Sequence, residues 1–121
     1  EFLSIGTNDL TQYVMAADRE NERVDDLHDP THPGVLRAIR RTAEAAHAND
    51  AWVGMCGEMA GNPELTELLV GLGLDELSMS AVTVPDVKTA VGETDTDAAS
   101  ALAERARGAA TREGVHDVLD S

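Results

Sequence analysis

The sequence has little cysteine, few aromatic side chains and no long apolar run, and each shortage excludes a class of protein. One cysteine in 121 residues rules out an internal disulfide and the cysteine pairs of structural zinc sites. One Phe, one Trp and one Tyr leave the core to aliphatic side chains, Met and Ala. No apolar run approaches the roughly 20 residues that span a membrane, and no signal peptide is recognisable. We therefore expect a cytoplasmic protein with no membrane partner.

Basic residues, and lysine above all, are also scarce. The chain has 9 Lys and Arg against 23 Asp and Glu, and Lys88 is its only lysine. The net charge of −14 argues against binding to nucleic acid or to an anionic membrane, because both need clustered Lys and Arg. An acidic, lysine-poor surface is typical of proteins that work in high salt, where screening weakens self-repulsion. We predict a halophilic protein; an ordinary acidic cytosolic protein is the alternative.

Short apolar runs alternate with segments of helical spacing. Buried strands are predicted at residues 2–5, 51–55 and 76–79, and helices over 10–15, 33–46, 63–72 and 84–91. Thr7 and Asn8 are expected to cap the first helix. Pro33 is expected to begin the second, Asn62 to cap the third and Gly73 to end it.

This order indicates an α/β fold with a parallel sheet, since strands alternate with helices. The continuous apolar runs indicate strands that are covered on both faces. Three strands cannot close on themselves, so we interpret residues 1–93 as part of a larger α/β barrel. Residues 94–121 form a helical tail of the same domain, capped within 94–96 and broken at Gly108 or Gly114. The tail has few large apolar side chains, so we expect it to dock loosely.

Polar residues follow each predicted strand, at 7–9, 56–58 and 78–80. Ligands of parallel α/β folds bind at this carboxyl-end face. Asn8 offers an amide donor and Asp9 a carboxylate suited to Mg²⁺, although local sequence favours helix-cap roles for both. Arg19 is suited to clamp a phosphate or a carboxylate, but alone it is better explained as a solvated arginine paired with acidic neighbours.

Cys56 raises the sharpest question about function. A buried cysteine is usually inert, but Cys56 stands at a strand end between Gly54 and Gly57, which leave room for a substrate. Glu58 nearby disfavours a thiolate, and a neutral thiol is a poor nucleophile but a plausible proton donor. Local sequence supports packing and proton donation equally. The histidines, at positions 28, 32, 47 and 116, lack metal-ligand spacing, so we expect solvated or capping roles for them.

Four motifs together resemble enzyme I of the phosphoenolpyruvate (PEP):sugar phosphotransferase system. They are SIGTNDLTQY at residues 4–13, ADREN at 17–21, GMCGEMAG at 54–61, and LDELSMS at 74–80 with Val-Pro at 84–85. The resemblance covers nearly the whole chain up to the acidic tail, and the composition indicates a haloarchaeal member. PEP synthase and pyruvate phosphate dikinase share the first and third motifs in looser form. The Gln12-Tyr13 pair, the 54–61 run and the Ser-Met-Ser stretch are more similar to enzyme I.

The resemblance implies a PEP-binding (β/α)₈ barrel, of which this chain supplies the last three β/α units. It implies that Asn8 and Arg19 bind the substrate phosphate and that Asp9 both contacts the substrate and ligates Mg²⁺. It implies that Cys56 is the general acid that protonates the enolate of pyruvate. The implied partners are PEP and pyruvate, a phosphohistidine domain N-terminal in the parent chain, and the phosphocarrier protein HPr.

Several expected parts of such an enzyme lie outside these residues. The acceptor histidine, the second metal carboxylate and further substrate arginines have no match here, so we expect a piece of a longer polypeptide that is inactive alone. A strand at the very start, with no initiator Met, agrees with this expectation. The resemblance also implies a homodimeric parent. The alternative of a different class is a non-catalytic interaction domain derived from the barrel.

Overall fold

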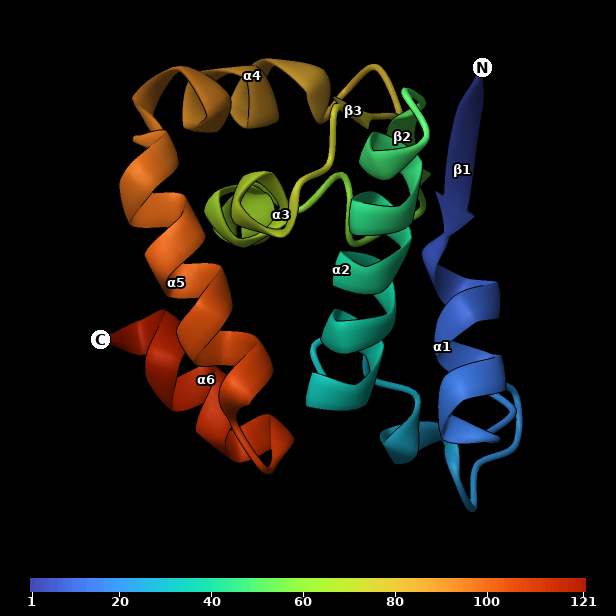
Figure 1. Ribbon diagram of the computed structural model, residues 1–121. Coiled ribbons are helices and arrows are strands. Elements are labelled where there is room, and N and C mark those ends of the chain that lie inside the picture. Colours follow the sequence, from blue (N-terminus) through green and yellow to red (C-terminus); the bar gives the residue numbers. More distant parts are fainter.

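The computed structural model describes residues 1–121 as a small parallel sheet packed against helices (Figure 1). The elements in chain order are β1 (Phe2–Gly6), α1 (Thr7–Met15), the short 3₁₀ helix η1 (Asp25–Leu27), α2 (Pro33–Ala48), β2 (Trp52–Cys56), the 3₁₀ turn η2 (Pro63–Leu65), α3 (Thr66–Leu72), β3 (Glu76–Leu77), α4 (Val84–Glu93), α5 (Thr96–Gly108) and α6 (Arg112–Asp120). Each strand leads into a helix, as the sequence predicts. No helix combines the length and the apolar character needed to cross a membrane.

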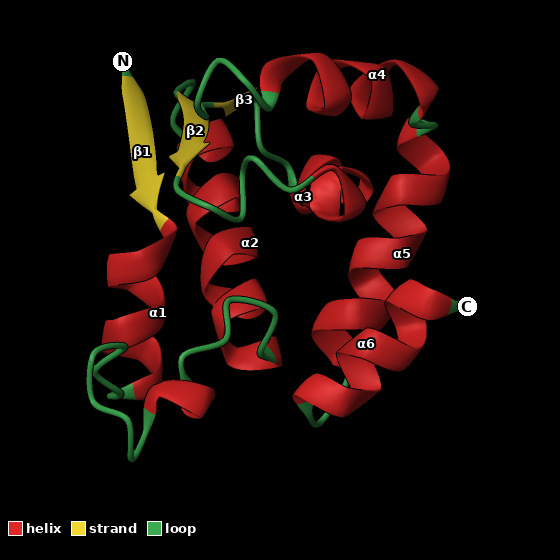
Figure 2. Cartoon of the chain, turned by 180° about the vertical axis from the view of Figure 1, so that it is seen from behind, coloured by secondary structure: helices red, strands yellow, loops and turns green.

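The sheet is parallel, with the order β1-β2-β3, which confirms the predicted pairing. Helix α2 covers one face of β1 and β2, and the view from behind shows no helix over the other face (Figure 2). Only Ile5 of β1 is buried, so the prediction of a strand covered on both faces is wrong for β1 within these residues. The exposed rings of Phe2 and Trp52 stack across the β1–β2 pair with centroids 4.7 Å apart.

Strand β3 is shorter than the predicted residues 76–79, because ladder pairing with β2 covers only Glu76 and Leu77. The next amide, that of Ser78, still donates to the carbonyl of Met55 over 2.8 Å. Beyond this bond the chain turns toward α4. The turn places residues 78–80 at the carboxyl end of the sheet.

Helix α1 begins directly at Thr7, so the prediction that Thr7 and Asn8 cap it is wrong. Gly6 occupies the cap position and makes no side-chain cap bond. The buried Thr7 hydroxyl instead donates to the carbonyl of Cys56 over 3.1 Å. This bond connects the start of α1 to the end of β2. The Asn8 side chain does not cap the helix.

Other helix ends follow the sequence prediction. Pro33 is the first residue of α2, and the Asn62 side chain caps the turn that leads into α3. Gly73 ends α3 with a φ of 105°, in the left-handed region that favours glycine. Asp95 caps α5, within the predicted interval 94–96. The core lies between the covered face of the sheet and helices α2, α3 and α5; it includes Val35, Leu36, Ile39, Val53, Met55, Leu68, Leu69 and Leu72.

The C-terminal tail is closely docked, so the expectation of loose docking is wrong. Helix α5 packs against α3, and Ala99 and Ala103 are buried along this contact. The two backbones approach so closely that a Cβ atom at Gly71 would lie 2.0 Å from the carbonyl oxygen of Ala99. Contact between small residues needs no large apolar side chains. The predicted break is confirmed at Gly108, whereas Gly114 lies within α6.

Asp75 joins the sheet to α2 through a single carboxylate oxygen. This oxygen accepts from the Nε2–H of His47 and from the N–H of the buried Val53, both over 2.8 Å. The hydrogen bond from His47, followed by that from Val53, holds the pKa of Asp75 below its ordinary value. A carboxyl group with a depressed folded pKa stabilises the fold above its unfolded pKa, and this stabilisation is lost as the pH falls through the folded pKa.

We therefore expect Asp75→Asn to lower the free energy of unfolding by about 1 kcal/mol at pH 7, a value kept small because the carboxylate is partly exposed. The difference from wild type should shrink below about pH 4, where the unfolded carboxyl is protonated. Urea unfolding at several pH values in molar salt measures both effects. Asp117→Asn on the exposed face of α6 is the matched control and should change little. If the difference in unfolding free energy between Asp75→Asn and wild type stayed constant down to pH 2.5, the stabilising role of the Asp75 carboxylate would be contradicted.

Candidate functional site

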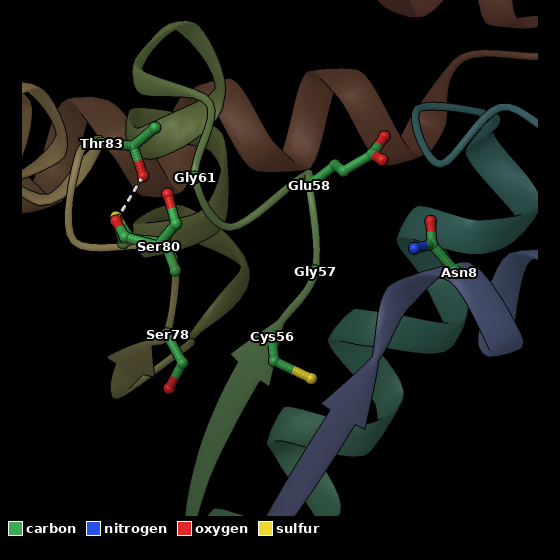
Figure 3. Close-up of a pocket in the computed structure, with 9 residues that line it drawn as sticks. Asn8, Cys56, Gly57, Glu58, Gly61, Ser78, Ser80 and Thr83 are labelled. Atoms are coloured by element: carbon green, nitrogen blue, oxygen red, sulfur yellow. Dashed lines mark hydrogen bonds between the residues drawn. The ribbon is translucent and has the colours of Figure 1, made fainter.

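The polar residues that follow the three strands meet around one hollow at the carboxyl end of the sheet (Figure 3). The hollow has a volume of about 590 Å³. It is lined by Asn8, Cys56, Gly57, Glu58, Gly61, Ser78, Met79, Ser80 and Thr83. The predicted grouping of residues 7–9, 56–58 and 78–80 is thus confirmed for most of its members. The buried Thr7 and the exposed Asp9 do not line it.

Cys56 is the last residue of β2 and is exposed to the hollow. Cys56 pairs with Gly6, the last residue of β1. Asn8 comes two residues after Gly6, so it lies just beyond the same end of the sheet. Figure 3 shows the thiol directed from the end of β2 toward the side on which Asn8 lies. The Cys56 thiol donates to the carbonyl oxygen of Ile5, which lies 3.7 Å from Sγ.

The backbone beside Cys56 has room for glycine alone. Gly57 has a φ of 108°, and a Cβ atom there would lie 2.5 Å from the Thr7 hydroxyl oxygen. That hydroxyl is the donor that holds the carbonyl of Cys56. Gly57 therefore lets β2 turn into the following loop without displacing the bond that fixes the cysteine.

A second hollow, also of about 590 Å³, lies beside the first and shares Asn8 and Glu58 with it. It brings Arg19 to the site, and its remaining lining residues are Glu20, Asp25, Asp26 and His28. The Arg19 guanidinium takes part in none of the ion pairs of the structure, so the interpretation of Arg19 as one half of a surface salt bridge is wrong. Four acidic residues and this one arginine line the second hollow, so its lining is acidic.

Asp9 lies in the first turn of α1 and is exposed. It lines neither of the two hollows. No group of three or more His, Cys, Asp and Glu side chains in the structure has the arrangement of a metal site. Asp9 can therefore supply one carboxylate to a cation, whose other ligands must come from elsewhere. One protein carboxylate with oxygen atoms of a substrate is a donor set that suits Mg²⁺.

Three of the four histidines have partners that the sequence did not reveal. His28 donates from Nε2 to the main-chain carbonyl of Asn8 over 2.9 Å. His47 bonds Asp75, and His116 lies 3.1 Å from the Thr31 hydroxyl. His32 caps α2, and His47 and His116 are exposed, so the expected capping and solvated roles are confirmed for these three histidines. No local pattern pointed to these contacts, because each joins segments that are at least 20 residues apart.

Comparison with known proteins identifies the family of this arrangement. Residues 1–96 match the family model described as PEP-utilising enzyme, PEP-binding domain. The chain belongs to the PEP-utilising enzymes. The resemblance read from the motifs at residues 4–13 and 54–61 is confirmed at this level. Cys56, Asn8 and Arg19 all lie within the part of the chain that matches the PEP-binding domain.

Relatives of this PEP-binding domain carry the name phosphoenolpyruvate-protein phosphotransferase. One from Haloferax volcanii is 67% identical over 119 residues, which cover 98% of this chain and 21% of the relative. One from Haemophilus influenzae is 50% identical over 106 residues, which cover 88% of this chain and 18% of the relative. One from Staphylococcus carnosus is 48% identical over 120 residues, which cover 99% of this chain and 21% of the relative. The chain thus spans about a fifth of the length of the curated relatives it matches.

Proposed function

We propose that this chain is the C-terminal part of the PEP-binding barrel of a phosphoenolpyruvate-protein phosphotransferase, enzyme I of the sugar phosphotransferase system. The observation that carries the proposal is the meeting of Cys56 and Asn8 in one hollow at the carboxyl ends of adjacent parallel strands. Transfer of phosphate from an enol needs a proton donor for the enolate that leaves and a hydrogen-bond donor for the phosphate, and Cys56 and Asn8 supply these two groups. Arg19 in the adjoining hollow adds a free guanidinium for the phosphate.

The proposed reaction transfers the phosphoryl group of PEP to a histidine nitrogen on another domain. The bond between phosphorus and the enol oxygen breaks, and the bond between phosphorus and nitrogen forms. The electron pair of the broken bond leaves with the enolate of pyruvate. Cys56 then gives its thiol proton to the methylene carbon of this enolate, which yields pyruvate and a thiolate. Because Cys56 is exposed, the thiolate regains a proton from water.

Asn8 and Arg19 are proposed to hold the substrate phosphate before transfer. The Asn8 amide donates a neutral hydrogen bond, and the Arg19 guanidinium offers a two-pronged charged contact. The carboxylates around Arg19 repel an anionic substrate, so this chain alone offers PEP a poor site. Asp9 would hold Mg²⁺ together with oxygen atoms of the substrate and ligands from the rest of the protein. When bound, the ion would neutralise phosphate charge.

The remaining parts of the proposal concern the whole protein. The three β/α units would complete a (β/α)₈ barrel with preceding units, and the open edge and bare face of β1 and β2 suit such a neighbour. The acceptor histidine would lie on a separate N-terminal domain, from which the phosphoryl group passes to HPr. The acidic, lysine-poor composition suits a cytoplasmic enzyme in high salt, and we propose a homodimer for the parent.

A chimera tests this function. The Haloferax volcanii relative supplies the host, and these 121 residues replace its matching segment. In molar salt with Mg²⁺, the chimera should transfer phosphate from PEP to HPr and release pyruvate. The isolated chain should show no turnover. ³²P transfer to HPr and pyruvate release measure the two reactions.

Three results would contradict the proposal. A chimera that folds as the host does but phosphorylates no HPr would favour a domain without catalytic function. Phosphoryl transfer to a small molecule in place of HPr would favour the dikinase or synthase type of PEP enzyme. PEP turnover by the isolated chain would show that the site needs nothing from outside these residues.

A further inference from the structure

His28 makes the only side-chain hydrogen bond between the loop that carries Arg19 and the helix that carries Asn8. Its Nε2–H donates to the Asn8 carbonyl over 2.9 Å, across 20 residues of sequence. All three residues line the second hollow. The bond leaves the Asn8 side chain itself free of any protein partner, so the amide remains available to a ligand. The contact therefore fixes the main chain of Asn8 without using its functional group.

The segment between Arg19 and His28 has enough internal bonding to carry this position from one residue to the other. The amides of Val24, Leu27 and His28 donate to carbonyls three residues earlier, over 3.0 Å each. The turn at Arg19 is closed by the Glu20 amide, which donates to the Asp18 carboxylate over 2.9 Å. A loop with successive local bonds moves as a unit, so anchoring His28 restricts the backbone of Arg19.

Helix α6 holds the other end of this loop. The Arg112 guanidinium donates to the carbonyl of Asp26, and the Nε2–H of His116 donates to the Thr31 hydroxyl over 3.1 Å. Thr31 in turn donates to Asp29 from its hydroxyl over 2.6 Å and from its amide over 2.9 Å. Burial acts to raise the pKa of Asp29, but the bonds from Thr31 outweigh it, so its pKa lies below the ordinary value. Asp29 is thus a charged anchor at neutral pH.

We infer that His28 is a positioning residue for PEP binding, which sets the Asn8 amide and the Arg19 guanidinium at the separation that one phosphate group requires. The inference rests on the proposed function, because it gives Asn8 and Arg19 a common ligand. In this role His28 acts on the substrate through Asn8 and Arg19, and it does not line the hollow that holds the proton donor Cys56. Its loss should therefore weaken substrate binding and leave the chemistry at Cys56 unchanged.

The kinetic test uses the chimera with three substitutions. His28→Phe keeps a ring and removes the donor, and it should raise the KM for PEP about fivefold, the effect of one hydrogen bond, with kcat within about twofold of wild type. His28→Gln restores an N–H donor and should recover most of the KM. Arg23→Gln is the control and should match wild type, because the exposed Arg23 side chain lies in the same loop and makes no hydrogen bond or ion pair. A loss in kcat at constant KM, or an unchanged KM, overturns the inference.

A second measurement keeps the inference testable if the chimera has no activity. In the 121-residue chain, hydrogen exchange of the amides of Val24, Leu27 and His28 should quicken about fivefold in His28→Phe, because the loop loses its anchor. Amides of β2 should not change. His28→Gln and Arg23→Gln should both exchange as wild type does. Unchanged loop exchange in His28→Phe would overturn the positioning role, whereas an inactive wild-type chimera with the expected exchange pattern would count against the proposed function alone.

Discussion

Cys56→Ala in the chimera should lower turnover of PEP to pyruvate at least about a hundredfold, the usual range for loss of a general acid. The substitution removes the only thiol of this chain from the hollow at the ends of β1 and β2. Binding of PEP should persist, because Asn8 and Arg19 remain in place. The KM for PEP should therefore stay within about twofold of wild type while kcat falls. Steady-state release of pyruvate in molar salt with Mg²⁺ measures both constants.

Cys56→Ser separates acid chemistry from packing. A serine hydroxyl can keep the contact with the carbonyl of Ile5 and fills nearly the same space, but it is a far weaker acid than a thiol. Turnover should remain low in this variant as well. Solvent deuterium should no longer enter the methyl group of pyruvate during exchange in either variant. If Cys56→Ser recovered full turnover, Cys56 would be a packing residue, and the enolate would take its proton from another source.

Gly71→Ala should give the largest loss of stability among single methyl additions to this chain, about 3 kcal/mol. The new Cβ atom would lie 2.0 Å from the carbonyl oxygen and 2.5 Å from the carbonyl carbon of Ala99. Both are backbone atoms, so no side-chain rotation relieves the overlap. Helix α5 must move away from α3, which uncovers the buried Ala103 and the core behind it. Urea unfolding in molar salt, followed by circular dichroism, measures the change.

Gly92→Ala is the matched control for this experiment. It makes the same chemical change within helix α4, where a Cβ atom meets no other atom within 4 Å. Alanine is the better helix former, so this variant should be unchanged or more stable by up to about 1 kcal/mol. If Gly71→Ala and Gly92→Ala unfolded at the same urea concentration, the close approach of α3 and α5 would not be a feature of the folded protein.

The sequence was a good guide wherever a residue type has one dominant structural use. Proline began α2 at Pro33, Asn62 capped the turn into α3, and glycine ended that helix in the left-handed region at Gly73. The alternation of strands and helices was enough to predict parallel pairing. Parallel pairing in turn predicted that Asn8 and Cys56 would meet, since the carboxyl ends of parallel strands lie at one edge.

The errors have a common physical cause, which is that the decisive contacts join distant segments. Thr7 looked like a helix cap because capping is its usual local use, but the Thr7 hydroxyl donates to the carbonyl of Cys56, which is 49 residues away. The tail looked loosely docked because alanine and glycine contribute little apolar area. Their value lies in the closeness they allow, which depends on Gly71 and Ala99 lying opposite each other. His28 is a further example, because no pattern near it in the sequence predicts its hydrogen bond to the Asn8 carbonyl.

The stack of Phe2 on Trp52 supplies an optical probe of one part of the molecule. The chain has a single tryptophan, and its ring stacks on Phe2 across the pair formed by β1 and β2. These two strands lie apart from α5 and α6 (Figure 1). Indole fluorescence therefore reports on the assembly of the sheet, whereas the far-ultraviolet dichroism of this chain is dominated by its helices. Following both signals through one urea titration would reveal whether the strands that carry Cys56 and the tail helices separate in one cooperative event or in succession.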